Sequence, residues 1–182
     1  MRKAAKEVLK ELEKTRKEFW NISNEVGQLL YLIIQDRAYK KVLEIGTSNG
    51  YSGIWIASAL EKTGGTLYTI ESNFKKRFPL SQQNFKKARL KNVEQILGHA
   101  PEVIPKTPRS FDMAFFDATK YEHIDYFNAI ESRIKKGGLI VTDNVCSHGE
   151  VLEKYIQSVQ KNRAFKSVVL DIDQGLMLSF KL

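Results

Sequence analysis

The sequence lacks the features that would hold a chain together covalently or place it in a membrane. It contains a single cysteine, Cys146, so no disulfide can form within the chain. We expect this thiol to be a small buried apolar side chain in a reducing compartment. The longest wholly apolar run, residues 29–34, is far too short to cross a bilayer. Residues 1–17 are charged throughout and do not form a signal-peptide pattern. We therefore expect a cytoplasmic protein without a membrane partner.

The sequence also lacks any segment that would act as a linker between domains. No segment rich in glycine, serine or proline divides the 182 residues, so we predict a single domain, large enough to fold without a disulfide or a metal. Apolar residues make up 42% and charged residues 27%, which argues against disorder.

The net charge is +8, and residues 73–92 contain seven Lys and Arg but no acid. This stretch is either a solvated helix face or a surface for phosphates.

Apolar periodicity predicts two leading helices within residues 1–36 and an alternating core over residues 41–182. The first helix should cover residues 3–20, and Ser23 should cap the second. They would form a lid or an oligomer contact. Strands are expected at residues 41–45, 66–70, 93–97, 111–116, 139–142, 165–172 and 176–180. Helices are expected at residues 52–60, from about Pro79, at 123–134 and at 149–160.

The last two predicted strands are joined by only three residues, Asp173-Gln174-Gly175. So short a link requires antiparallel pairing, whereas the earlier strands are separated by helices that allow parallel crossovers. The predicted fold class is therefore α/β, a three-layer sandwich whose mostly parallel sheet ends in an antiparallel hairpin.

The most informative segment is Val42–Ser52, which indicates a buried strand, a glycine turn and a helix start. Gly46 and Gly50 would let the backbone approach a ligand closely, although such turns also occur for packing alone. Their spacing is not the G-x-G-x-x-G of dinucleotide sites, which favours a ligand without pyrophosphate. Glu44 stands at the carboxyl end of the first strand. Glu71 ends the second, where a carboxylate can bind both hydroxyls of a ribose.

Oxygen-bearing side chains follow two later strands. Asp117 ends the fourth predicted strand, and Asp143 with Asn144 ends the fifth. Each could be a cap or a turn residue by itself. At the same edge of one sheet they would form an all-oxygen site of the kind that Mg²⁺ prefers.

These segments, with Lys120 and the terminal hairpin, occur in the order seen in a known family. Over residues 22–182 the sequence resembles the cation-dependent O-methyltransferases that include catechol and caffeoyl-coenzyme A methyltransferases. The resemblance implies the Rossmann-like, class I S-adenosylmethionine (SAM) methyltransferase fold with a seven-stranded sheet.

The resemblance also implies roles for individual residues. Asp117, Asp143 and Asn144 would hold a divalent cation, Mg²⁺ before Mn²⁺ or Ca²⁺. Lys120 would be the general base, with Asp117 beside it in catalysis. The residues expected to bind SAM are Glu44, Gly46, Ser48, Asn49, Gly50, Tyr51, Ser52, Glu71, Ser72, Ala100 and Asp117.

The sequence does not decide the roles of three histidines. His99 stands in the adenine-side turn, where the family often has an acid or a small polar residue. His123 replaces the tyrosine that the family usually places three residues after the lysine. It could line the acceptor pocket, join the metal shell or face solvent. His148 follows Asn144 closely and could touch the acceptor or be an ordinary loop residue.

The leading hypothesis is a SAM- and metal-dependent O-methyltransferase acting on a small hydroxylated, catechol-like acceptor. One alternative keeps the reaction and places the hydroxyl on a uridine of tRNA, which the basic residues 73–92 would suit. Another is a SAM-binding module without catalysis, which the intact Asp117, Lys120, Asp143 and Asn144 disfavour. A nicotinamide dehydrogenase is disfavoured by the missing dinucleotide motif. A homodimer could form through the leading helices.

Overall fold

Seven strands form one sheet in the order β3-β2-β1-β4-β5-β7-β6. The computed structural model describes all 182 residues. Strands β1 to β5 pair in parallel, and β7 pairs antiparallel with both β5 and β6. The antiparallel β6–β7 hairpin is the one predicted from the short final link. The strands are β1 Lys41–Ile45, β2 Thr66–Glu71, β3 Val93–Leu97, β4 Phe111–Phe116, β5 Ile134–Thr142, β6 Phe165–Leu170 and β7 Leu176–Lys181.

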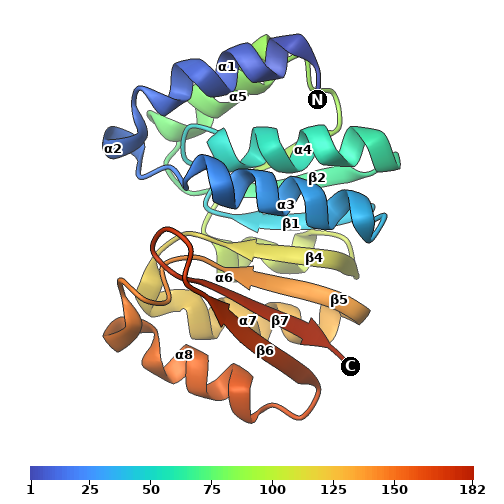
Figure 1. Cartoon of the computed structure of the whole chain (residues 1–182), viewed down its shortest axis with the longest axis vertical. Helices are drawn as coiled ribbons and strands as arrows, with labels where there is room; N and C mark the ends of the chain where they lie inside the picture. Colours follow the sequence, from blue (N-terminus) through green and yellow to red (C-terminus); the bar gives the residue numbers. More distant parts are fainter.

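Helices cover both faces of the sheet and complete the three layers (Figure 1). One apolar core joins α1, α3, α4 and α5 to the sheet, and a second joins α6, α7 and α8 to the opposite face. The helices are α1 Lys3–Glu13, α2 Arg16–Phe19, α3 Asn24–Asp36, α4 Tyr51–Thr63, α5 Arg77–Lys87, α6 Ala100–Val103, α7 His123–Ile130 and α8 Gly149–Lys161. Short 3-10 turns cover Ile104–Lys106, Lys120–Glu122 and Glu131–Arg133.

The first predicted helix, residues 3–20, is broken into α1 and α2. Two side chains cap the end of α1: Thr15 Oγ1 and Asn21 Nδ2 both donate to the Leu12 carbonyl, at 3.0 and 3.1 Å. Such bonds compete with the helical backbone ladder. The chain then leaves α2 through Trp20, which has a left-handed φ of 53°. The prediction of one continuous helix was therefore wrong.

The segment that joins α7 to β5 also differs from the predicted helix over residues 123–134 and strand over residues 139–142. Helix α7 ends at Ile130 rather than Ile134, and Ile134 already belongs to β5. Gly137 and Gly138 lie within this strand, where its pairing with β4 shifts register between Phe111 and Met113. The glycines therefore form a bulge inside the strand, which begins five residues earlier than expected.

The leading helices belong to the packed core. Ser23 caps α3, since its Oγ accepts from Val26 N at 3.2 Å, as predicted. The apolar side of α1, which includes Val8, is buried against α4 and α5. Pairing of two chains through this face would have to displace these contacts, and the homodimer stays a prediction. No helix combines the length with the apolar character that a membrane crossing requires.

Cys146 is exposed, so the prediction of a buried thiol was wrong. Its backbone N–H donates to the Gln174 carbonyl at 3.0 Å, which holds the residue on the outer rim of the β6–β7 turn. In the same loop Val145 is buried in the core beneath α6, α7 and α8, so only part of the segment between β5 and α8 is exposed.

Candidate active site

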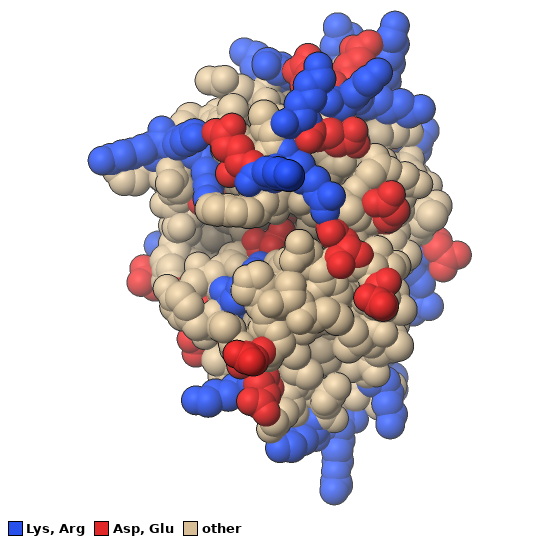
Figure 2. All heavy atoms as spheres, turned by 60° about the vertical axis from the view of Figure 1, so that its left-hand side comes forward, with Lys and Arg blue, Asp and Glu red and all other residues tan.

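A cavity of about 1320 Å³ lies beyond the carboxyl ends of β1, β2, β4 and β5. The strand order reverses between β1 and β4, and open α/β sheets bind ligands at such a switch point. Its volume exceeds the roughly 300–1,000 Å³ of ordinary small-molecule pockets. There is accordingly room for a cofactor and a second ligand. Figure 2 shows the hollow below a group of basic side chains, with acidic atoms inside it.

The β1–α4 turn forms one wall, and two of its glycines are sterically required. Gly46 has φ +103°, and a Cβ there would lie 2.4 Å from the backbone oxygen of Asp117. Gly50 has φ +88° and precedes the first residue of α4. A side chain at position 46 would therefore push apart the tips of β1 and β4. Gly50 shapes the turn without lining the cavity.

Glu44 lies behind this turn rather than in the cavity. Its carboxylate is fully buried and accepts hydrogen bonds from Ser52 Oγ at 2.6 Å and Thr69 Oγ1 at 2.5 Å. Burial raises its pKa to about 7, against the opposing effect of these two hydroxyls. Glu44 is absent from the cavity lining, whereas Ser52 is part of it. The structure thus places Glu44 as a support for the turn.

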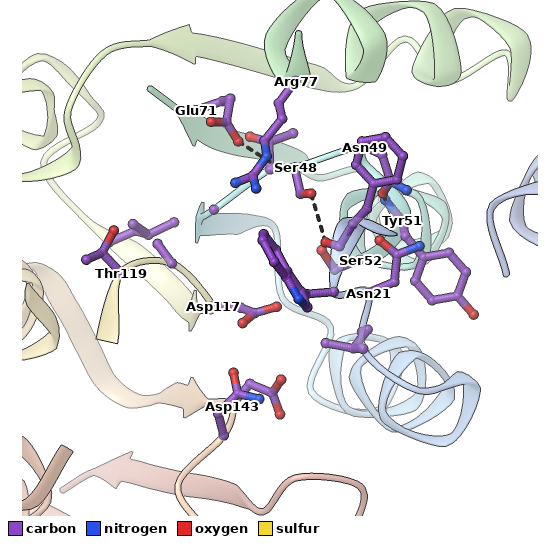
Figure 3. A pocket seen from close by; sticks show the side chains of 18 of the residues that line it. Asn21, Ser48, Asn49, Tyr51, Ser52, Glu71, Arg77, Asp117, Thr119 and Asp143 are labelled. Carbon is purple, nitrogen blue, oxygen red and sulfur yellow. Dashed lines mark hydrogen bonds between the residues drawn. The ribbon is translucent and has the colours of Figure 1, made fainter. Parts of the chain in front are cut away.

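Glu71 does face the cavity, at the tip of β2. One carboxylate oxygen accepts from Ser48 N at 2.8 Å (Figure 3), and the other accepts from Asn73 N, also at 2.8 Å. These two bonds fix the plane of the carboxylate and leave its other lone pairs free for ligand hydroxyls. Ser48, with a left-handed φ of 50°, also donates through Oγ to the Phe19 carbonyl at 3.1 Å.

The other expected cofactor residues surround the same hollow. Asn49 is buried, and its Nδ2 has no hydrogen-bond partner in the protein. Tyr51 donates from its hydroxyl to Glu13 at 3.1 Å. Ser72 and Ala100 line the cavity, and so does His99. His99 is tied to Glu122 at 3.0 Å, and this hydrogen bond raises the pKa of the imidazole.

Asp117 and Asp143 come together at the tips of β4 and β5, as predicted. Asp117 N donates to the Ile45 carbonyl at 3.0 Å, and Asp143 N donates to the Phe116 carbonyl at 3.1 Å. These backbone bonds hold the two tips side by side. Figure 3 shows both carboxyl groups pointing into the hollow. Lys120 Nζ lies 2.8 Å from Asp117 Oδ1.

The electrostatics of this pair depend on burial. Asp143 is only 3% exposed, and burial raises its pKa to about 7, with the neighbouring charge of Asp117 adding to the rise. Burial also raises the pKa of Asp117, although the Lys120 ammonium opposes it. The carboxylates of Asp117 and Asp143 both interact with the Lys120 ammonium, so when both are ionised one negative charge of the pair is left without a compensating lysine.

The donor set fits a hard divalent cation. Asp143 Oδ1 is buried without a hydrogen-bond partner, an arrangement that is costly unless a ligand satisfies it. Asn144, with a left-handed φ of 66°, lines the cavity next to it. The structure contains no cluster of three or more His, Cys, Asp or Glu that could hold a metal. An ion here would therefore take Asp117, Asp143, the Asn144 amide and water oxygens.

The two remaining histidines, His123 and His148, lie in different surroundings. His123 is fully buried between Phe116, Tyr126 and Tyr155 and does not line the cavity. Two of the three alternatives that the sequence left open, a solvent-facing position and a place in the acceptor pocket, are therefore wrong. Its Nδ1 lies 3.1 Å from the Thr119 carbonyl, and burial lowers its pKa to about 4. His123 thus supports the segment that carries Lys120. His148 is exposed at the cavity rim, with Nδ1 2.9 Å from Ser147 Oγ.

The sequence did not reveal that ten consecutive residues, Glu13–Ile22, line the cavity. We call this segment the N-terminal strap. Arg16 Nη2 lies 2.7 and 2.8 Å from the two oxygens of Asp173 on the β6–β7 turn. Glu18 pairs with Lys76 at 3.0 Å on the other side. The only sequence signal was the expectation that the leading helices form a lid.

Comparison with known proteins supplies an independent finding. The sequence model of a family described as O-methyltransferase matches residues 2–179. A catechol O-methyltransferase of Niastella koreensis is 36% identical over 156 residues, covering 82% of this chain and 70% of that protein. Caffeoyl-CoA O-methyltransferase 1 of Zea mays is 31% identical over 188 residues, covering 93% and 70%.

A solved structure agrees with these sequence matches. It is an O-methyltransferase of Streptomyces achromogenes that is involved in tomaymycin synthesis, in complex with SAM. Its TM-score with this chain is 0.85 at 25% identity, and the match covers 100% of this chain and 90% of that one.

Proposed function

Because the chain belongs to the O-methyltransferase family and is a SAM-dependent O-methyltransferase, we propose that it methylates a hydroxyl of a small aromatic, catechol-like acceptor with the help of a divalent cation. The observation that supports the cation most directly is the unpartnered, buried Asp143 Oδ1 beside Asp117. Membership of the family removes the dehydrogenase and the non-catalytic module from consideration.

We place SAM along the β1–α4 turn, between Glu71 and Asp117. The Glu71 carboxylate would accept hydrogen bonds from the ribose hydroxyls, and Ser72 would lie beside it. His99 and Ala100 would border the adenine. The methionine part would lie along Gly46, Ser48, Asn49, Tyr51 and Ser52. Glu44 and Gly50 would act on it through the shape of the turn, since neither lines the cavity.

The chemistry then requires that a hydroxyl lose its proton next to an electrophilic methyl group. When bound, SAM supplies that methyl on a positively charged sulfur, and the cation stabilises negative charge on the acceptor oxygen. Asp117, Asp143 and Asn144 would hold the cation and so orient the acceptor. Lys120 Nζ, at the same rim, would accept the proton when it is in its neutral form. Orientation of this kind can lower a barrier by about 7–11 kcal/mol.

The strap and the buried surroundings would exclude water from this reaction. Residues Glu13–Ile22 cover the cavity and are clamped at Arg16 and Glu18, so the reacting groups would meet in a largely enclosed space. A lower local dielectric strengthens the interaction of the fixed charges with the developing negative charge.

Replacement of Asp143 by Ala tests the cation site. We expect the D143A variant to lose methyl transfer to catechol while it still binds S-adenosylhomocysteine, because Asp143 lies beyond the SAM-binding turn. Calorimetric titration with Mg²⁺ in the presence of S-adenosylhomocysteine should show a binding isotherm for the wild type and none for the variant. Methyl transfer that continues in excess chelator would refute the cation.

A second candidate acceptor is a hydroxylated uridine of tRNA. The observation that favours it is the basic stretch 73–92, whose lysines are exposed at the start of α5, at its end and in the loop that follows. A screen of catechols, hydroxycinnamoyl thioesters and tRNA for S-adenosylhomocysteine release distinguishes the candidates.

A further inference from the structure

We propose that Glu122 selects the adenine of SAM by accepting a hydrogen bond from its exocyclic N6 amino group. His99 and Tyr126 are positioning residues that hold the Glu122 carboxylate for this contact. The inference rests on the placement of SAM proposed above, and it adds recognition of the base to the binding of the ribose by Glu71.

The two ends of the cavity lie on either side of the ribose position. Figure 3 shows Tyr51 and Thr119 at opposite ends of the hollow, with Glu71 at its edge. The methionine part of SAM is placed toward Tyr51, so the base, on the other side of the ribose, lies toward Thr119. We call this part of the cavity the base end, and its lining residues are Gly98, His99, Ala100, Thr119, Glu122 and Tyr126.

Hydrogen bonds lead from the ribose site to Glu122. Gly98 N donates to the Glu71 carbonyl at 3.0 Å, which fixes the turn after β3 beside the tip of β2. His99 is the next residue in this turn, and its Nε2 lies 3.0 Å from Glu122 Oε1. Glu122 ends the 3-10 turn that follows β4, so this contact ties two separate walls of the cavity together.

The Glu122 carboxylate is held by one donor at each oxygen. Tyr126 donates from its hydroxyl to Oε2 at 2.6 Å, and His99 Nε2 is the donor to Oε1 because an ionised carboxylate has no proton to give. Burial would raise the pKa of Glu122, but these two hydrogen bonds outweigh it and lower the pKa. The carboxylate is therefore ionised, and each oxygen keeps a lone pair for a donor on a ligand.

An ionised acceptor at the base end suits adenine. The amino group at C6 of adenine carries two protons, whereas hypoxanthine and guanine carry an oxygen there, which the carboxylate would repel. Gly98 and Ala100 have no polar side-chain atom, so they cannot make this distinction. Glu122 is the only carboxylate of the base end, and a hydrogen bond to a charged group is stronger than one between neutral groups.

The test compares S-adenosylhomocysteine with S-inosylhomocysteine, in which an oxygen replaces the N6 amino group. Calorimetric titration gives both dissociation constants for each variant. We expect the wild type to bind the adenosyl ligand at least about tenfold more tightly, because the inosyl ligand lacks the hydrogen bond to a charged acceptor. Glu122→Gln should lose most of this preference, since a neutral amide can also donate to the oxygen.

Glu102→Gln is the matched control. Glu102 is the second acid that faces His99, with Oε1 3.7 Å from Nδ1, but it does not line the cavity. This variant removes the same charge near His99 and should keep the wild-type ratio of the two dissociation constants. Tyr126→Phe keeps the charge of Glu122 and removes one of the bonds that hold it, so it should lower the ratio less than Glu122→Gln does.

A wild-type ratio in Glu122→Gln would overturn the role of Glu122, even if both ligands bind more weakly, because a merely structural role would affect them alike. An equal fall of the ratio in Glu102→Gln would also overturn it, and an unchanged ratio in Tyr126→Phe would overturn the positioning role of Tyr126.

Glu71→Gln separates the placement of SAM from the recognition of the base. It should weaken both ligands alike, because they share the ribose, and unchanged binding of both would refute the placement. Methylation of catechol by the wild type is measured separately. Its absence, with the expected ratios in all variants, would refute the proposed acceptor and leave the role of Glu122 in place.

Discussion

Gly46 joins the cofactor turn to the proposed cation site, and its replacement by Ala tests that connection. The residue has φ +103°, a conformation that costs a side chain about 1–3 kcal/mol. The new Cβ would also lie 2.4 Å from the Asp117 backbone oxygen, which cannot move as a flexible side chain would. Overpacking of this kind adds about 1–3 kcal/mol. We therefore expect G46A to destabilise the protein by about 4 kcal/mol.

Gly64 provides the matched control. It has φ +72° at the end of α4, but nothing lies within 4 Å of the Cβ that Ala would add. Gly64→Ala should therefore cost only the backbone strain, about 1–2 kcal/mol. The difference between the two variants isolates the contact between the β1 and β4 tips.

Urea denaturation followed by circular dichroism gives both free energies of unfolding, and calorimetry gives the affinity for S-adenosylhomocysteine. G46A should weaken that affinity by about tenfold or more, because the clash displaces both the turn and Asp117. G64A should leave it unchanged. If the two variants lose equal stability and both bind the cofactor normally, the close approach of Gly46 to Asp117 is not a constraint on the site.

Two further predictions concern the buried acid and the strap. The Glu44 pKa is raised from 4.5 to about 7, so the unfolded state releases its proton first and stability falls as the pH rises through this window, by about 3 kcal/mol. Glu44→Gln should remove the Glu44 contribution to this dependence and leave the contribution of Asp143, whose pKa is also raised to about 7, in denaturation curves recorded between about pH 4.5 and 7.5. A curve with the wild-type slope would refute the assignment. Arg16→Ala opens one clamp of the strap and should speed release of S-adenosylhomocysteine severalfold in stopped-flow fluorescence. Arg2→Ala, which breaks the Arg2–Glu61 pair away from the cavity, should not, and equal release rates in both variants would show that the strap does not retain the cofactor.

Much of the fold and the chemistry could be predicted from the chain alone. Strands alternating with helices imply parallel pairing, and parallel strands bring their carboxyl ends to one edge. This geometry places Glu71, Asp117 and Asp143 together without knowledge of any contact. The antiparallel hairpin followed from a link too short for a crossover. Local rules sufficed wherever the governing interaction lay within a few residues.

Only the tertiary structure decided how each side chain is used. Glu44 and Glu71 both lie near strand ends, yet one is buried against Ser52 and Thr69 while the other faces the cavity. His123 lies among three aromatic side chains that are contributed by separate elements. Arg16 meets Asp173 across 157 positions of sequence. Contacts of this kind depend on how the layers pack, and that packing is set by the whole core rather than by any local pattern of residues.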